Sequence, residues 1–151
     1  MNNAQEVMLS ITGIQDIGGD KDKIELITGG TLQKIDNEYI IDYDETIETG
    51  MEDTHTRINA SAEKVVITRS GARSSQLLLE KGKRHLNHYD TGYGQVIMGI
   101  STSKIDNTIA LNGELSVAYS IEMNHTLASK NSFLLKIKEV KNNGCKSSVC
   151  N

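Results

Sequence analysis

The sequence predicts an all-β protein that folds as one closed antiparallel β-barrel of about eight to ten strands. Apolar residues alternate with polar ones along much of the chain, which is typical of strands with one buried face. Turn sequences rich in glycine and asparagine separate these runs. The chain has no proline, a residue that would remove a hydrogen-bond donor from a sheet. A barrel is favoured over an open sheet because closure removes exposed strand edges.

The alternating runs cover residues 7–14, 38–48, 63–70, 94–104, 114–123 and 133–138. In the second run the inward face is expected to continue as far as Ile47. Between two later runs, Asn112–Gly113 favours a two-residue type I′ hairpin, because both central residues of that turn have positive φ. The residues expected to lead the barrel interior are Val7, Leu9, Ile11, Tyr39, Ile41, Val65, Ile67, Val96, Met98, Val117, Tyr119, Phe133 and Leu135.

A single domain is expected over residues 1–140, followed by a flexible C-terminal tail at residues 141–151. The tail carries both cysteines, Cys145 and Cys150, at a spacing that matches no zinc pattern. No apolar run approaches the roughly 20 residues that cross a bilayer, and the N-terminus lacks the features of a signal peptide. We therefore expect a cytoplasmic protein with no membrane partner.

The charge balance argues against nucleic acid as a partner. The net charge is −4, from 16 basic and 20 acidic residues, whereas a duplex-binding surface needs clustered lysine and arginine. The basic residues Lys81, Lys83 and Arg84 are expected to form a solvated turn. Both a monomer and a homodimer are compatible with the sequence.

The middle of the chain resembles a known bacterial family. The segments that carry the resemblance are YDE (43–45), TGM (49–51), THT (54–56), ITRSG (67–71), SQ (75–76) and YDTGYG (89–94). Together with their spacing, over roughly residues 5–140, they look like the consensus of the YwiB-like proteins, a domain of unknown function. Gly92 stands where that family usually has proline. The resemblance implies a lipocalin-like (calycin) β-barrel, and it implies no activity, cofactor or catalytic residue.

Two charged residues continue apolar faces. Glu45 follows Tyr43 and Ile41, and Arg69 follows Val65 and Ile67. If these faces point inward, Arg69 needs a carboxylate such as Glu45, because removing one partner of a buried ion pair costs about 3–5 kcal/mol. In one interpretation Arg69 meets an anionic group of a small ligand, since guanidinium offers carboxylate or phosphate a planar two-point contact. In the other, Arg69 lies at the barrel rim and pairs with Glu45 only to set the register.

The segment RHLNHYDTGYG (84–94) holds two of the four histidines. On a strand, His85 and Tyr89 share one face and His88 lies on the other, so the segment is expected to be structural rather than a metal site. The polar residues Thr54, Thr56 and Thr102 could join the zone around Arg69. The candidate ligand-binding residues are Tyr43, Glu45, Arg69, Gln76, His85 and Tyr89.

An acidic strip at Asp42, Asp44 and Glu48, with Glu52 and Asp53 nearby, fits no calcium-binding loop and is expected to be a solvated outer face. No metal, cofactor or catalytic residue is assigned. The leading hypothesis is a small binding protein that holds one small, anionic ligand in the barrel, rather than an enzyme. The alternatives are an enzyme that uses Glu45, His85 and Tyr89 as acid–base groups, and an interaction module without a ligand.

Overall fold

The computed structural model describes residues 4–49, 52–72, 74–90 and 94–140. The expected C-terminal tail lies outside these residues. Among the described residues, none of the helices is long and apolar enough to cross a membrane. The elements are β1 (Gln5–Ile17), β2 (Asp20–Ile35), β3 (Glu38–Asp44), the 3-10 helix η1 (Ile47–Thr49), β4 (Thr54–Ala60), β5 (Lys64–Gly71), β6 (Ser75–Glu80), β7 (Arg84–Asp90), β8 (Gln95–Thr108), α1 (Ile109–Asn112), β9 (Glu114–Met123) and β10 (Thr126–Glu139).

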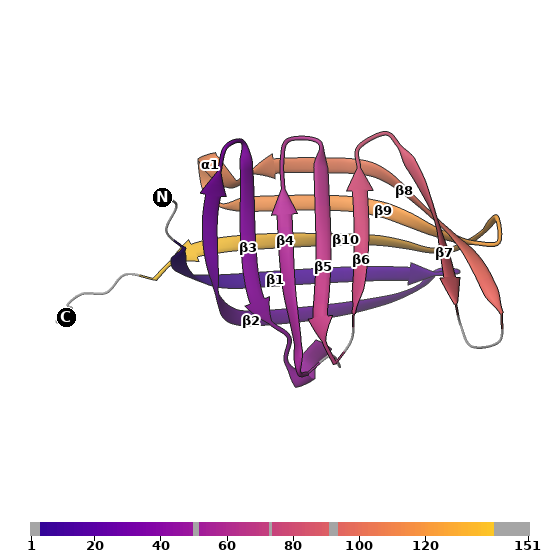
Figure 1. Ribbon diagram of the computed structural model, residues 1–151, viewed down its shortest axis with the longest axis horizontal. Helices are drawn as coiled ribbons and strands as arrows, with labels where there is room; N and C mark the ends of the chain where they lie inside the picture. Colours follow the sequence, from indigo (N-terminus) through magenta and orange to yellow (C-terminus); the bar gives the residue numbers. More distant parts are fainter. Residues whose placement is uncertain (1–3, 50–51, 73, 91–93, 141–151) are drawn as a thin grey trace, which may run out of the picture.

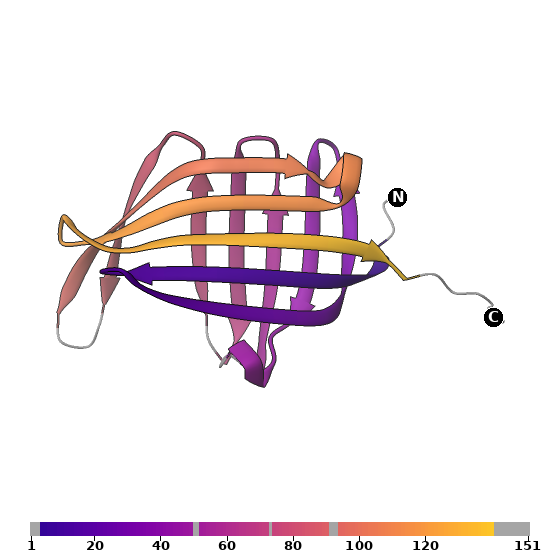
Figure 2. The same cartoon turned by 180° about the vertical axis from the view of Figure 1, so that it is seen from behind.

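The strands form one antiparallel sheet in the order β6-β5-β4-β3-β2-β1-β10-β9-β8-β7. The sheet folds over itself, so that β3–β6 cross the long strands β1, β10, β9 and β8 (Figures 1 and 2). β2 belongs to both layers, because its residues from Asp20 to Leu32 pair with β1 and those from Gly30 to Ile35 pair with β3. The all-β antiparallel barrel predicted from the alternation is confirmed.

The barrel is nearly closed rather than fully closed. Lys81, just after β6, forms a parallel bridge with Thr102 of β8, and the backbone N–H of Gly82 donates to the carbonyl of Thr102 at 2.9 Å. The edge strands β6 and β7 share no ladder in the described part of the chain. On the other side, the first half of β2 pairs with β1 alone, because its ladder with β3 begins only at Gly30.

The predicted interior matches the core closely. Seven of the predicted residues are buried: Val7, Leu9, Ile41, Val65, Ile67, Val117 and Leu135. Ile11, Tyr39, Met98, Tyr119 and Phe133 are half-buried and pack against them. Val96 does not join the core, because β7 and β8 extend beyond the layer formed by β3–β6. Ile47 is also wrongly predicted to face inward: β3 ends at Asp44, and Ile47 lies in η1 with 74% of its surface exposed.

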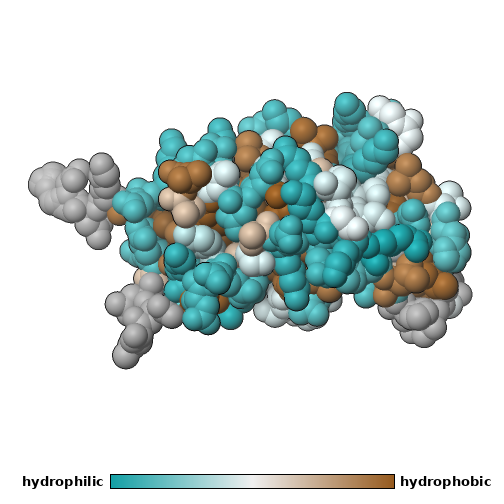
Figure 3. All heavy atoms as spheres, turned by 90° about the horizontal axis from the view of Figure 1, so that it is seen from above, coloured by the Kyte–Doolittle hydropathy of each residue, from teal (hydrophilic) through white to brown (hydrophobic). Residues whose placement is uncertain are grey.

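The turn at Asn112–Gly113 is not the predicted type I′ hairpin. Asn112 ends the short helix α1, and Gly113 caps it in the left-handed region with φ 73°. Two-residue turns with positive φ at both positions occur instead at Gly18–Gly19 and Asn124–His125. Seen from above, hydrophobic residues are scattered among hydrophilic ones and form no single continuous patch on that face (Figure 3).

Candidate functional site

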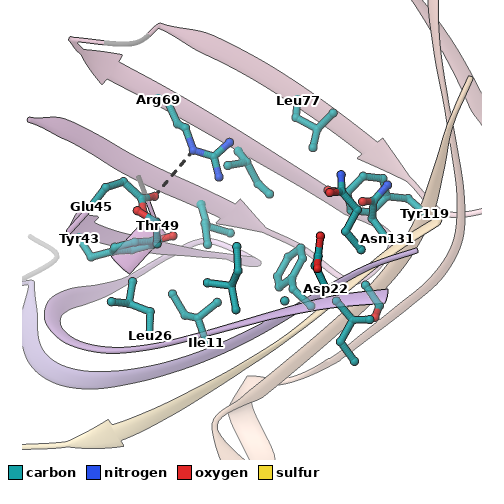
Figure 4. Close-up of a pocket in the computed structure, with 18 residues that line it drawn as sticks. Ile11, Asp22, Leu26, Tyr43, Glu45, Thr49, Arg69, Leu77, Tyr119 and Asn131 are labelled. Carbon is teal, nitrogen blue, oxygen red and sulfur yellow. Dashed lines mark ion pairs between the residues drawn. The ribbon is translucent and has the colours of Figure 1, made fainter. Parts of the chain in front are cut away.

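A cavity of about 400 Å³ lies inside the barrel, beside the stretch of β2 that pairs with β1 alone (Figure 4). Most of its wall is apolar. Its polar side chains lie in two groups, one around Arg69 and Glu45 and the other around Asp22. The lining residues are Ile11, Gly13, Ile14, Gln15, Asp22, Ile24, Leu26, Tyr43, Glu45, Thr49, Ile58, Ile67, Arg69, Leu77, Tyr119, Asn131, Ser132 and Phe133. A mainly apolar cavity with a few convergent polar groups is the usual form of a small-molecule site.

Glu45 is the buried carboxylate of this cavity. It follows the end of β3 but stays attached to the sheet, because its backbone N–H donates to the carbonyl of Thr54 at 2.8 Å. Its side chain is only 1% exposed. The hydroxyl of Thr56, the neighbouring inward residue of β4, donates a hydrogen bond to Oε2 of Glu45. A carboxylate removed from water in this way needs such donors and a counter-ion.

Arg69 of β5 supplies the counter-ion. Its Nε lies 3.7 Å from Oε2 of Glu45, and its side chain is 26% exposed. Nε is buried and has no hydrogen-bond partner among the described residues. The other two guanidinium nitrogens point away from Glu45 into the cavity (Figure 4). Arg69 therefore presents a planar pair of donors to the space where a ligand would lie.

Two tyrosines border the same charges. Burial raises the pKa of Tyr43, and the charge of Glu45 and a hydrogen bond to that carboxylate raise it further, while Arg69 opposes the shift. Burial also raises the pKa of Tyr119, again against the charge of Arg69. Both phenols are therefore neutral at physiological pH and can donate hydrogen bonds within the cavity.

A second polar group lies across the cavity from Arg69. Asp22 comes from the half of β2 that pairs with β1 alone, and its cross-strand neighbours are Gln15 of β1 and, beyond it, Asn131 of β10. These three side chains line the cavity together, and Figure 4 shows the carboxylate of Asp22 directed toward its interior. Asp22 is exposed, so it belongs to the mouth of the cavity rather than to its floor.

The structure brings together three of the six candidate ligand-binding residues. Tyr43, Glu45 and Arg69 all line the cavity. Gln76 does not, because Ser75 is the partner of Arg69 on β6, so that Gln76 points outward and is exposed. The remaining two candidates come from β7. His85 faces the seam of the barrel, where its Nε2 lies 3.0 Å from Oε1 of Glu80, and the side chain of Tyr89 lies outside the described residues.

Of the threonines expected near Arg69, Thr54 and Thr56 lie on the inward face of β4 beside Glu45. Thr102 is buried too, but it lies at the barrel seam opposite Lys81. The acidic strip is solvated only in part, because Asp42 is largely buried between Arg57 and His55. Within the described part of the chain, no group of three or more histidine, cysteine, aspartate or glutamate side chains could hold a metal ion.

The sequence analysis did not identify the residues that β2 and β6 contribute to the cavity. β2 supplies Asp22, Ile24 and Leu26, and β6 supplies Leu77. Their signal in the sequence is weak, because the inward face of β2 begins with a carboxylate and its outward face includes Ile27, which is 74% exposed. A strict apolar alternation is therefore missing in the part of β2 that has a neighbouring strand on one side only.

Comparison with known proteins identifies a family and a fold. A family model described as a domain of unknown function (DUF1934) matches residues 9–135. A solved structure, the crystal structure of the ywiB protein from Bacillus subtilis, is similar to this one with a TM-score of 0.69 and 17% sequence identity. The similarity covers 91% of this chain and 94% of that one. No curated protein sequence matches the chain.

Proposed function

Because the chain belongs to the family of the domain of unknown function DUF1934, which carries no assigned activity, we propose a function from the cavity itself. The protein binds one small molecule inside the barrel, and an acidic group of that molecule is held by Arg69. The binding is non-catalytic. A cytoplasmic location, and a monomeric or homodimeric state, stay predictions from the sequence.

The observation that carries the proposal is the position of Arg69 at the wall of an apolar cavity of about 400 Å³. Its Nε faces Glu45, and its two remaining nitrogens face the cavity. A guanidinium that served only to neutralise Glu45 would need no open space beside it. The volume lies in the range of about 300–1,000 Å³ that small-molecule sites occupy.

The enzyme alternative receives less support. It requires Glu45 and His85 to converge within hydrogen-bond reach. Glu45 is bound to Thr56 and Arg69 at the cavity, whereas His85 is bound to Glu80 at the barrel seam and does not line the cavity. The interaction-module alternative gains no support from the face drawn in Figure 3, which has no continuous apolar patch.

Native mass spectrometry of the protein purified from its own host tests the proposal. We expect a bound molecule with an acidic group, and we expect Arg69→Met to lose it. Because Arg69→Met leaves Glu45 without its counter-ion, the double variant Glu45→Gln/Arg69→Met is measured beside it. Arg84→Met is the matched control, since Arg84 pairs with Glu122 on the outer face.

Two results would contradict the proposal. One is a wild-type protein that carries no small molecule and is not stabilised by any small carboxylate. The other is a bound molecule that Arg69→Met and the double variant both retain at the wild-type occupancy.

A further inference from the structure

Among the residues that the structure describes, three charged side chains line the cavity, and two of them are negative. They are Arg69, Glu45 and Asp22. Glu45 is buried and lies 3.7 Å from Arg69, so these two charges largely cancel. The carboxylate of Asp22 has no ion pair or hydrogen bond to any residue that the structure describes. The cavity therefore has one uncompensated negative charge, that of Asp22, at its mouth.

The neighbouring lysines do not neutralise Asp22. Lys21 and Lys23 flank it along β2, and successive side chains of a strand point to opposite faces. Lys23 also has a partner on its own face, since its Nζ lies 3.3 Å from Oε1 of Glu25. Asp22 consequently faces the cavity without a cation beside it.

This distribution of charge is poorly matched to a ligand that is only an anion. Such a ligand would place a second negative charge in a cavity whose uncompensated charge is already negative. A ligand that also carries a cation near Asp22 would leave every charge in the cavity matched. The cation and the acid must be apart in the ligand, because Arg69 and Asp22 lie on different sides of the cavity (Figure 4).

The wall between these two groups sets the rest of the ligand. It is formed by aliphatic and aromatic side chains, among them Ile11, Leu26, Ile67, Leu77 and Phe133. These side chains gain free energy from an apolar partner and offer it no hydrogen bonds. The body of the ligand must therefore be largely apolar.

We propose that the ligand is a zwitterion with a largely apolar body: a carboxylate held by Arg69, an ammonium group near Asp22, and mainly apolar groups filling the space between them. The inference rests on the proposed function. Two kinds of molecule fit this description. One is a dipeptide with apolar side chains, whose single amide could accept a hydrogen bond from Tyr43 or Tyr119 in the cavity wall. The other is an amino acid whose amine is at the far end of an aliphatic chain.

Calorimetric titration at low ionic strength tests the inference with octanoate, octylamine and 8-aminooctanoate, together with their shorter and longer homologues. We expect 8-aminooctanoate or one homologue to bind about fivefold more tightly than the matching carboxylate, the upper limit for a partly solvated ion pair. Asp22→Asn should remove this preference and leave the affinity for the carboxylate equal or higher. Glu25→Gln is the matched control, since it removes a negative charge from the outer face of the same strand, and it should keep the preference.

A second pair of probes distinguishes the two kinds of ligand. Leucyl-leucine and N-acetyl-leucyl-leucine differ only in whether the amine is charged. If the dipeptide is the natural form, leucyl-leucine binds more tightly than both its acetylated form and 8-aminooctanoate. If the aliphatic amino acid is the natural form, 8-aminooctanoate binds more tightly than leucyl-leucine.

The outcomes separate this inference from the proposed function. If octanoate binds as tightly as every zwitterion, or if Asp22→Asn leaves the preference unchanged, the zwitterion is wrong and an acid-binding cavity stands. If none of the simple carboxylates, aminocarboxylates or dipeptides binds, both the zwitterion and the proposed function are wrong.

Discussion

Nε of Arg69 lies 3.7 Å from Oε2 of Glu45, and this contact joins β5 to the segment that follows β3 inside the barrel. The two residues do not share a ladder, since Thr56 of β4 lies between them and donates to the same carboxylate oxygen. The pair thus has two roles. It compensates a buried charge, and it orients the remaining nitrogens of Arg69 toward the cavity.

Arg69→Met should lower the free energy of unfolding by about 3 kcal/mol, at the low end of the range for breaking a buried ion pair, because Arg69 is 26% exposed. Glu45→Gln/Arg69→Met should recover a large part of this loss, because it leaves no unpaired charge. Urea unfolding of the wild type, both single variants and the double variant measures the coupling. Additive single effects would contradict the pairing.

Thr56→Val should lower the free energy of unfolding by about 1–3 kcal/mol, because it removes a donor from a buried carboxylate. Thr54→Val is the matched control on the same strand. The hydroxyl of Thr54 is buried without a hydrogen-bond partner in the described part of the chain, so its replacement by a methyl group should be neutral or stabilising. Equal effects of the two substitutions in urea unfolding would show that the Thr56 bond is unimportant.

Gly30→Ala should lower the free energy of unfolding by about 2 kcal/mol, because Gly30 lies where β2 passes between the two layers. An added Cβ would lie 2.5 Å from the carbonyl oxygen of Asp42 and 2.7 Å from Cδ1 of Leu9. Gly29→Ala is the control, since nothing lies within 4 Å of the corresponding position. Thermal unfolding of both variants checks this, and a Gly30→Ala protein as stable as Gly29→Ala would contradict the close approach.

The contribution of His55 to stability should depend on pH. Hydrogen bonds from its ring to Asp44 and Asp42 raise its pKa. A group whose pKa is raised on folding stabilises the protein fully below its unfolded pKa of about 6.5, and this contribution is lost as the pH rises through the folded pKa. The difference in unfolding free energy between the wild type and His55→Gln should therefore shrink from pH 5.5 toward higher pH. A difference that stays constant or grows over that range would contradict the contact.

Asp42 adds an opposite dependence at low pH. Although its burial opposes the shift, hydrogen bonds from Arg57 and His55 lower the net pKa of this carboxyl. Its stabilising contribution is present above the unfolded pKa of about 3.9 and is lost as the pH falls through the lower, folded value. Compared with Asp42→Asn, the wild type should thus lose its advantage in acid. An advantage unchanged down to pH 2 would exclude this role.

The sequence by itself determined the strands that have strict alternation and the direction of their side chains. Leu9, Ile41 and Val117 could be assigned to the interior because a period of two is a local property of the chain. The same argument correctly placed Glu45 and Arg69 on apolar faces. The expectation that Gln76 joins the zone around Arg69 did not rest on alternation and is wrong: the register of β6 against β5 places Ser75 opposite Arg69 and directs Gln76 outward.

Only the tertiary structure decided that Asp22 and Arg69 border one cavity. Asp22 reaches it because β2 bends from one layer to the other and leaves its first half without a second neighbour. Where β2 begins to pair with β3, Gly30 lies against Asp42 and Leu9, which come from two other strands and leave no space for a Cβ. Contacts between distant segments are set when the sheet folds over itself, and no period along the chain encodes them.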